Sequence, residues 1–354
     1  MSADGPQGSI DAFAEAEALV DEFGPRPPGS DAERRAARHL AERLQALGRE
    51  VVTETFPVWP AWAAGYVVNC VLAIVGSVLA VSSATLGTGL VLLATVLTFL
   101  DLSGIVPTTR RLFGRRASQN VVSWGDRDKP GALILVAHVD TGPVRTWPLR
   151  PLFFALLLLL ACCVARAGGM SGTLLTIVQF LPTVVLIVYV ALLFDVVLSP
   201  ALSGENDNAS GVALALRLAE RLDGELEYFG VHVVFTGSQK AMAQGMRAFL
   251  KAHRKELKPG DTVVLNLDGL GGGETRLTKK EGPLLTVPSH PKLTGATDVE
   301  TVVAREPSDG YAAASARFPA VTVTGTADRL EEDALAEAEE VSVEIVESID
   351  EELG

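Results

Sequence analysis

The phrase Ser203-Gly204-Glu205-Asn206-Asp207-Asn208-Ala209-Ser210-Gly211 decides how this chain of 354 residues is interpreted. Two shorter phrases belong with it: Ala137-His138-Val139-Asp140 comes earlier and Asn266-Leu267-Asp268 comes later. His138 and Asp268 each follow a short β-branched run that predicts a strand, and Asp207 precedes a predicted helix. Because ligands bind at the carboxyl ends of the strands in open α/β sheets, we expect these three side chains at one such edge.

Short β-branched runs alternate with helical patterns through the polar part of the sequence. The predicted strands are 51–56, 120–124, 132–137, 231–236, 263–267 and 320–324, and the predicted helices are 32–47, 210–222, 241–253 and 330–352. This order predicts an α/β fold, a three-layer α/β/α sandwich around a mixed, mostly parallel sheet.

Two long uncharged stretches interrupt this pattern. Residues 61–100 contain no Asp, Glu, Lys, Arg or His, whereas one membrane-spanning helix needs only about 20 apolar residues. A second apolar stretch runs from 151 to 194 and has a glycine-rich turn after Arg166. We therefore predict two transmembrane hairpins with four spans. The hairpins are predicted at 61–107 and 147–200, the first with helices at 62–82 and 88–107.

Basic residues around the hairpins predict how the chain is oriented. Six arginines flank the predicted inner ends, whereas Arg166 alone lies at an outer turn. The six are Arg110, Arg111, Arg115, Arg116, Arg145 and Arg150. The excess of positive charge predicts that both termini and the globular part are cytoplasmic. The N-terminus shows no basic-then-apolar leader. Asp101 and Asp195 end the second helix of each hairpin and are either interfacial acids or functional groups within the membrane.

Charge and cysteine content exclude several classes of function. The net charge is −13, and twelve acidic residues lie between Asp328 and Glu352, so one acidic helix carries most of it. Such a chain is not expected to bind nucleic acid. Cys70, Cys162 and Cys163 lie in apolar runs without zinc-finger or redox spacing and are expected to be packing residues.

Together, the three phrases resemble the metal-binding phrases of the two-zinc aminopeptidase family, which includes aminopeptidase Y and bacterial leucyl aminopeptidase. The phrase 24–30, Gly-Pro-Arg-Pro-Pro-Gly-Ser, is also similar to one near the start of that family's domain. The resemblance implies a zinc-exopeptidase-like domain, also described as phosphorylase/hydrolase-like, assembled from three segments that the hairpins separate. The segments are 1–60, 108–146 and 201–354.

The resemblance also implies roles for site residues. His138, Asp207 and Asp268 match the ligands of one zinc ion, and Asp140 matches the acid that orients the histidine. The second zinc shares the bridging aspartate and needs a glutamate and a late histidine in the family. Lys240 stands in place of that glutamate, and Gly325 in place of that histidine.

The family's general base is also replaced, because Gln239 occupies its position. Glutamine cannot accept a proton from a metal-bound water, and the loss of a general base costs about 10²–10⁴ in rate. The Lys240 ammonium cannot ligate a cation, and we expect it to pair with Asp207 instead. Three losses at family positions indicate that two-metal peptide hydrolysis is absent.

Two functions follow from this pattern. The first is a membrane-anchored pseudopeptidase that binds a peptide or a membrane-protein partner, or acts as a scaffold. The alternative is an active aminopeptidase or amidohydrolase that uses a single remaining metal, with Glu205 or Asp309 as base. The cofactor is accordingly one zinc ion or none. If no metal is bound, we expect Asp207 to cap its helix and Asp268 to pair with Lys240.

Weaker signals complete the sequence-based expectations. Ser308 and Asp309 belong to a phrase similar to one in the family's binding pocket, although it also reads as an ordinary turn. His290 is the one further histidine that we consider as a substitute ligand. The small residues of the hairpins suit packing against another subunit, so the bilayer, a peptide or protein, and an oligomeric copy are the expected partners.

Overall fold

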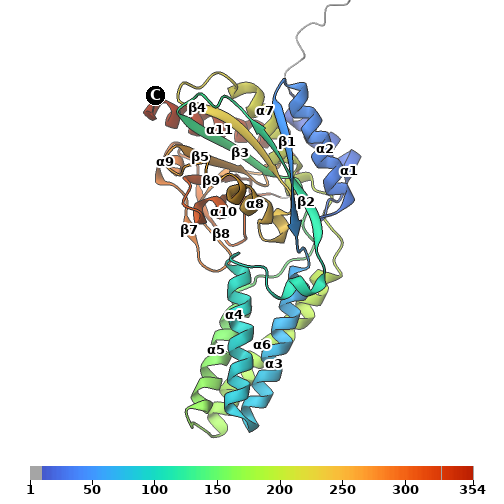
Figure 1. The fold of residues 1–354 in the computed structure, drawn as a ribbon, viewed down its shortest axis with the longest axis vertical. Helices are drawn as coiled ribbons and strands as arrows, with labels where there is room; N and C mark the ends of the chain where they lie inside the picture. The colour runs from blue at the N-terminus through green and yellow to red at the C-terminus, as the bar shows by residue number, and fades with distance from the viewer. Residues whose placement is uncertain (1–9, 328, 354) are drawn as a thin grey trace, which may run out of the picture.

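The fold was analysed in a computed structural model, which describes residues 10–327 and 329–353. The expectations about the extreme N-terminus and about Asp328 lie outside the described residues. Figure 1 shows a globular α/β part from which four long helices project as a bundle.

A nine-stranded mixed sheet forms the centre of the globular part. Its order is β1-β2-β4-β3-β5-β9-β6-β7, with β8 paired to β6. The four strands β4, β3, β5 and β9 run parallel. β2 pairs antiparallel with β4, β6 pairs antiparallel with β9, and β1 pairs antiparallel with β2. The strands are β1 Glu50–Val58, β2 Arg116–Trp124, β3 Gly131–His138, β4 Phe229–Thr236, β5 Thr262–Leu267, β6 Arg276–Glu281, β7 Val287–Pro288, β8 Thr301–Ala304 and β9 Ala320–Thr324.

Helices cover both faces of this sheet, so the predicted three-layer sandwich is confirmed. Alternate residues of β3 show the reason: Leu133 and Leu135 join one apolar core, whereas Ile134 and Val136 join the other. The first core contains α1, α2, α7 and α11, and the second contains α8 and α10. These helices are α1 Ala12–Phe23, α2 Asp31–Ala46, α7 Ser210–Leu222, α8 Gln244–Ala252, α10 Asp309–Ser315 and α11 Glu332–Leu353.

Several elements differ from the sequence-based expectation. The predicted helix 241–253 begins only at Gln244, because Met242 and Ala243 have left-handed backbone angles after the 3₁₀ turn η3, Gln239–Ala241. The sequence reasoning also did not place α1, α9 (Pro291–Thr294), α10 or the strands β6 to β8. These strands are short and partly polar, so they carry little periodicity.

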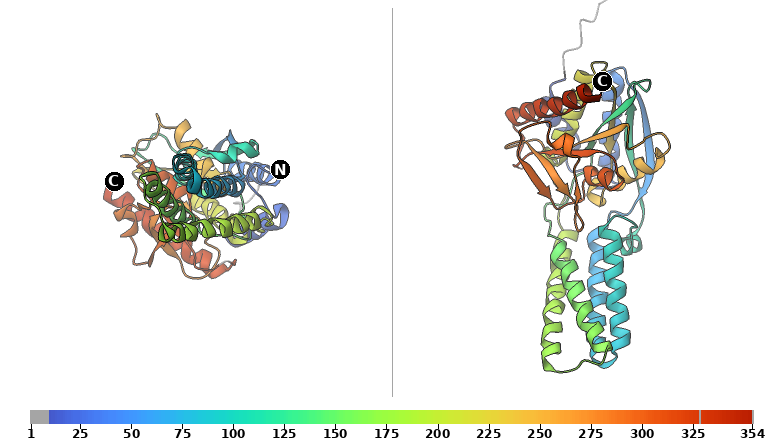
Figure 2. Two further views of the ribbon diagram at one scale, coloured as in Figure 1. Left: turned by 90° about the horizontal axis from the view of Figure 1, so that it is seen from below. Right: turned by 90° about the vertical axis from the view of Figure 1, so that its left-hand side faces the viewer.

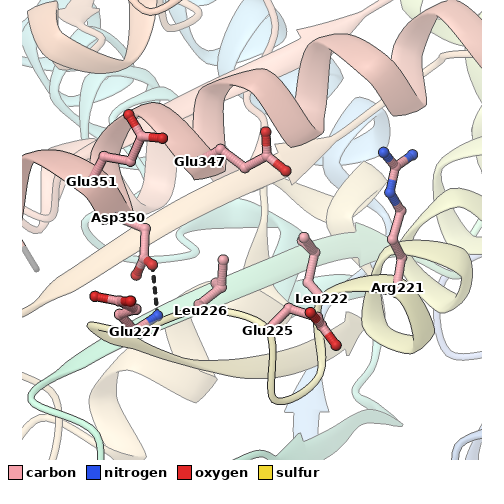
Figure 3. Close-up of a pocket in the computed structure, with 8 residues that line it drawn as sticks. All are labelled: Arg221, Leu222, Glu225, Leu226, Glu227, Glu347, Asp350 and Glu351. Atoms are coloured by element: carbon pink, nitrogen blue, oxygen red, sulfur yellow. Dashed lines mark hydrogen bonds between the residues drawn. The ribbon is translucent and has the colours of Figure 1, made fainter.

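The acidic C-terminal helix is fixed to the sheet by one of its own carboxylates. Asp350 accepts hydrogen bonds from the backbone N–H groups of Glu227, Tyr228 and Phe229 at 2.7–3.1 Å. Figure 3 shows Asp350 pointing from α11 toward Glu227 at the edge of a small hollow. The other face of α11 carries the exposed acids that the sequence predicts.

Four helices are long and apolar enough to cross a membrane among the residues described. They are α3 Trp62–Ser82, α4 Ala84–Leu102, α5 Arg150–Ala167 and α6 Thr173–Val197. They lie side by side as two hairpins pointing away from the sheet (Figure 2). The first turn is tighter than expected, since Ser83 alone separates α3 from α4. The second helix ends at Leu102 rather than 107, and Gly104 then takes a positive φ of 67°.

Buried contacts join this bundle to the globular part. Asp101 at the end of α4 pairs at 2.6 Å with Arg110, and both side chains are buried. Arg110 also donates to the carbonyl of Ala241, 2.9 Å away. Asp195 instead pairs with Arg145 at the surface. The two acids occupy equivalent positions in the sequence but have different surroundings. Of the two, only Asp101 connects the bundle to η3, and it does so through Arg110.

Glycines allow the helices of the first hairpin to approach closely. A Cβ added at Gly87 would lie 2.3 Å from the backbone nitrogen of Ala80 and 2.5 Å from the carbonyl oxygen of Gly76. Asn69 and Thr98 share a hydrogen bond between the same two helices, at 3.0 Å. The hairpin thus combines small residues with a polar contact, as transmembrane helix pairs do.

We predict that Gly87→Ala destabilises the hairpin, because its methyl group meets backbone atoms that cannot rotate away. Overpacking of this kind costs about 1–3 kcal/mol, and the thermal midpoint of the detergent-purified protein should fall. Gly89→Ala is the matched control, since its Cβ would meet nothing within 4 Å. The control should unfold at or above the wild-type temperature, because alanine favours helix over glycine. Equal midpoints for the two variants would contradict this packing.

Candidate functional site

The sheet brings the predicted site residues together at one edge. His138 ends β3, Asp268 follows β5, and Gln239 and Lys240 follow β4. Gly325 follows β9, and Asp207 lies in the π-helical turn η2, Glu205–Ala209, just before α7. Because β3, β4, β5 and β9 are parallel neighbours, their carboxyl ends place these residues around one point.

His138 faces two carboxylates at this edge. Its Nε2 atom lies 3.3 Å from Asp268 Oδ1 and 3.8 Å from Asp207 Oδ1. Its Nδ1 atom lies 2.8 Å from the backbone oxygen of Asp140. Burial lowers the pKa of His138, and the positive charge of Lys240 lowers it further. The nearby carboxylates outweigh both effects, so the pKa of His138 lies above its ordinary value.

Lys240 completes the cluster with a positive charge. Its Nζ atom lies 2.5 Å from Asp207 Oδ1, and the two side chains are only 20% and 15% exposed. Burial lowers the pKa of Lys240, but Asp207 and Asp268 outweigh it and raise that pKa above its ordinary value. The pKa values of both carboxyl groups lie below the ordinary range, because Lys240 and His138 outweigh the effect of burial. The cluster therefore pairs the ammonium of Lys240 with Asp207 and the imidazole of His138 with Asp268.

Two of the contacts differ from those expected for a site without metal. Asp207 does not cap α7, which lacks a side-chain cap; its Oδ2 atom accepts a hydrogen bond from the N–H of Gly142, 2.7 Å away. Asp268 forms its short contact with His138, and Lys240 forms its short contact with Asp207. The expected pair of Lys240 with Asp207 is present, whereas the alternative pair with Asp268 is a longer-range attraction.

Asp140 holds the loop that carries the replaced residues. Its carboxylate accepts the backbone N–H groups of Gln239 and Lys240, both at 2.8 Å. Its contact with the histidine runs through the backbone oxygen, while the nearest carboxylate oxygen lies 3.7 Å from Nδ1. Asp140 thus positions Lys240 as directly as it positions His138.

Gln239 and Gly325, at the positions that the family resemblance gives to the general base and the late histidine, are both closely packed. The Gln239 amide nitrogen donates to the carbonyl of Pro307 at 3.0 Å, and its buried oxygen has no hydrogen-bond partner among the described residues. A Cβ added at Gly325 would lie 2.6 Å from the oxygen of Gly272 and 2.9 Å from that of Gly269. A histidine at 325 therefore does not fit without moving backbone.

The weaker sequence candidates lie around the cluster rather than in it. Ser308 caps α10 and donates to Glu281, and Asp309 is buried and accepts from Thr236. Burial raises the pKa of Asp309 to about 7. His290 precedes α9, and its backbone N–H bonds Ala320, at the opposite end of β9 from Gly325. His290 is therefore not a substitute ligand in this arrangement.

Arg26 is a site residue that the sequence reasoning did not single out. It is fully buried, and its guanidinium donates to the carbonyls of Val139 at 2.9 Å and Gly24 at 2.7 Å, with longer bonds to Ser203 and Gly204. It thereby ties the histidine phrase to the aspartate phrase. The arginine within the phrase 24–30 was the available signal, but only the tertiary contacts reveal what it holds.

A cavity of about 640 Å³ opens beside this cluster. Asp207, Gln239, Lys240, Asp268 and Gly325 line its inner end. Neither Ser308 nor Asp309 lines it, whereas their neighbours Glu306 and Pro307 do. Its volume is in the range of small-molecule and peptide pockets.

Comparisons with known proteins agree with this geometry. The model of the family described as peptidase family M28 matches residues 120–327, more than half of the chain. No curated protein sequence matches. Solved structures share the fold at low sequence identity. They include a leucine aminopeptidase precursor from Bacteroides thetaiotaomicron (TM-score 0.53, 14% identity, 98% of this chain and 99% of that one), a zinc aminopeptidase from Bacillus subtilis (0.56, 11%, 98% and 96%) and a glutaminyl cyclase from Fimbriiglobus ruber (0.55, 16%, 98% and 97%).

We predict that Arg26→Ala destabilises the globular part by about 2–4 kcal/mol, since charge-assisted hydrogen bonds are lost and buried carbonyls lose their partner. Thermal unfolding of the purified protein measures this loss. Arg34→Ala is the control, because Arg34 is exposed and pairs only with Asp31 on the same helix. It should change stability by less than about 0.5 kcal/mol. A midpoint for the Arg26 variant equal to that of the control would contradict the bridging role.

Proposed function

The chain belongs to peptidase family M28, and we propose that it is a membrane-anchored member that has lost two-metal hydrolysis and binds a peptide or protein segment in its former substrate cavity. The observation that carries this proposal is the contact of Lys240 Nζ with Asp207 Oδ1 at 2.5 Å. In the family resemblance, Asp207 is the ligand shared by both metals. A fixed cation on that oxygen takes the place of one of them.

The residues present do not fit a pair of metal ions. Zinc is bound by imidazole, carboxylate and thiolate groups, and neither the Lys240 ammonium nor Gly325 supplies one. The backbone oxygens of Gly269 and Gly272 also fill the space that a side chain at 325 would need. His138, Asp207 and Asp268 retain the donor types of one site, but Lys240 competes for Asp207. We therefore derive no catalytic step through metal.

The membrane placement is part of the proposal. The four apolar helices supply the spans, and the arginines at their inner ends outnumber the single Arg166 near the outer turns. This charge asymmetry supports a cytoplasmic globular part with both termini on the same side. The polar and glycine contacts within the bundle support specific packing of the hairpins in the bilayer.

A second candidate is a single-metal aminopeptidase or amidohydrolase. It is favoured by the convergence of two carboxylates on His138, because Oδ1 of Asp268 lies 3.3 Å and Oδ1 of Asp207 lies 3.8 Å from its Nε2 atom. It lacks an assigned base, because Glu205 does not line the cavity and Asp309 is buried behind Thr236. We rank it second for that reason.

The proposal predicts that the purified full chain releases no N-terminal amino acids from aminoacyl anilides or short peptides when zinc is supplied. The physical reason is the absence of a base and of a second cation at the scissile carbonyl. Metal-dependent release that Asp268→Ala abolishes would refute it. Release that persists in the Asp268 variant would instead identify a contaminating peptidase.

Lys240→Glu tests the role of the lysine as a built-in cation. The variant places a third carboxylate beside Asp207 and Asp268, so it should be less stable in chelator and should be stabilised by zinc. Binding at 100 times the dissociation constant adds about 2.7 kcal/mol, which raises the thermal midpoint by several degrees. Lys240→Met is the control, since it removes the charge without adding a ligand.

The same titration separates the two candidate functions. The proposal predicts that zinc leaves the wild-type midpoint unchanged. A wild-type midpoint that zinc raises, and that no longer responds in His138→Ala, would support the single-metal alternative.

A further inference from the structure

The cavity beside Lys240 extends from the sheet edge to the ends of two apolar helices. Trp62 begins α3 and Arg150 begins α5, and both line the cavity. Met242, next to the site loop, lines it and packs into the same apolar cluster as the bundle. In the proposed membrane arrangement, the mouth of the cavity therefore lies at the level of the lipid head groups.

The wall at this mouth is apolar and aromatic. Trp62, Trp147, Pro148, Leu149 and Met242 contribute to it. Trp147 is 41% exposed, and tryptophan is enriched where chains meet the bilayer surface. Trp62 and Arg150 begin two of the four apolar helices, so the wall adjoins the ends of the proposed spans.

Two arginines lie at the same mouth without acidic partners. Arg150 donates to the carbonyls of Pro283 at 3.1 Å and Leu284 at 2.7 Å. Arg305 also lines the cavity and is exposed. Within 10–327 and 329–353, neither arginine forms an ion pair with a carboxylate.

The acids of the cavity form no ion pair with these arginines among the described residues. Asp207 and Asp268 face Lys240 and His138 at the inner end. Glu306, the remaining acid of the wall, adds to the negative potential at Lys240. Acidic and basic side chains of the lining are equal in number, but the two arginines lie beside the apolar wall without a carboxylate bonded to them.

We propose that the mouth of the cavity holds one anionic phospholipid of the membrane, with its phosphate between Arg150 and Arg305 and an acyl chain along Trp147 and Leu149, while the inner end at Lys240 remains for the peptide or protein segment. Arginine pairs recognise phosphate through charge-assisted hydrogen bonds. Basic pockets at the inner ends of transmembrane helices bind anionic head groups in the same way. This inference rests on the proposed membrane placement, but not on the loss of hydrolysis.

The test is native mass spectrometry of the full chain in mild detergent, titrated with phosphatidylglycerol or with phosphatidylcholine. Wild type should retain one phosphatidylglycerol and discriminate against the neutral lipid. Arg305→Gln should weaken retention about tenfold or more, because one charge-assisted contact is lost. Arg305 is exposed and forms no ion pair within the described part of the chain, so this variant should keep the wild-type thermal midpoint. Arg150→Gln should add to the loss.

Arg145→Gln is the matched control. Arg145 lies in the same loop, pairs with Asp195 and does not line the cavity, so its variant should retain the lipid as wild type does. Retention that is equal in the Arg305 variant, or equal for the neutral lipid, would overturn the proposal. Displacement of the lipid by inorganic phosphate at the same concentration would overturn it too, since the site would then recognise a free anion.

Extraction of membranes with sodium carbonate separates this inference from the proposed function. If the chain is extracted, the membrane placement fails and the lipid site fails with it. If the chain remains in the membrane but retention is insensitive to the arginines, only the lipid site fails. Photo-crosslinking from the 142–150 loop in intact membranes is a separate test of the lipid site. It should yield lipid adducts, and adducts with a protein segment alone would overturn the lipid site.

Discussion

The short contact between Lys240 and Asp207 governs what the rest of the site can do. Two carboxylates and an imidazole at the carboxyl edge of a sheet need a positive charge, because burying carboxylates without one raises their free energy. Here the chain supplies that charge itself, at 2.5 Å from Asp207. The pKa values of both aspartates are lowered and the pKa of Lys240 is raised, because the opposite charges outweigh the effect of burial. Lys240 thus supplies a positive charge at the position where the proposed function no longer has a second metal ion.

The framework around this pair has kept its geometry. Arg26 joins the histidine phrase to the aspartate phrase, and Asp140 accepts the N–H groups of Gln239 and Lys240. These contacts depend on backbone groups, so they do not require particular side chains at Gln239 and Lys240. After β9, by contrast, backbone oxygens lie so close to Gly325 that a larger side chain does not fit there without moving backbone. The fold is therefore that of the family, while the packing at 325 disfavours a histidine.

The proposed membrane placement gives the cavity a second function to serve. Its inner end lies at the carboxyl edge of the parallel strands, and its outer end is built from the first residues of α3 and α5. Arg110 links the end of α4 to Ala241, one residue beyond Lys240, so the bundle and the site loop share a buried contact. A ligand that enters at the mouth would meet both elements.

The sequence by itself determined the family, the layered α/β fold and the four apolar helices. Those features depend on local patterns: β-branched runs, uncharged stretches and short phrases that carry their chemistry with them. The tertiary structure alone decided that Lys240 meets Asp207 rather than Asp268, that Asp140 holds the loop of Lys240, that Arg26 bridges two phrases, and that Ser308 and Asp309 lie outside the cavity. Each of these features depends on residues that lie far apart in the chain. No local pattern determines which of them come into contact.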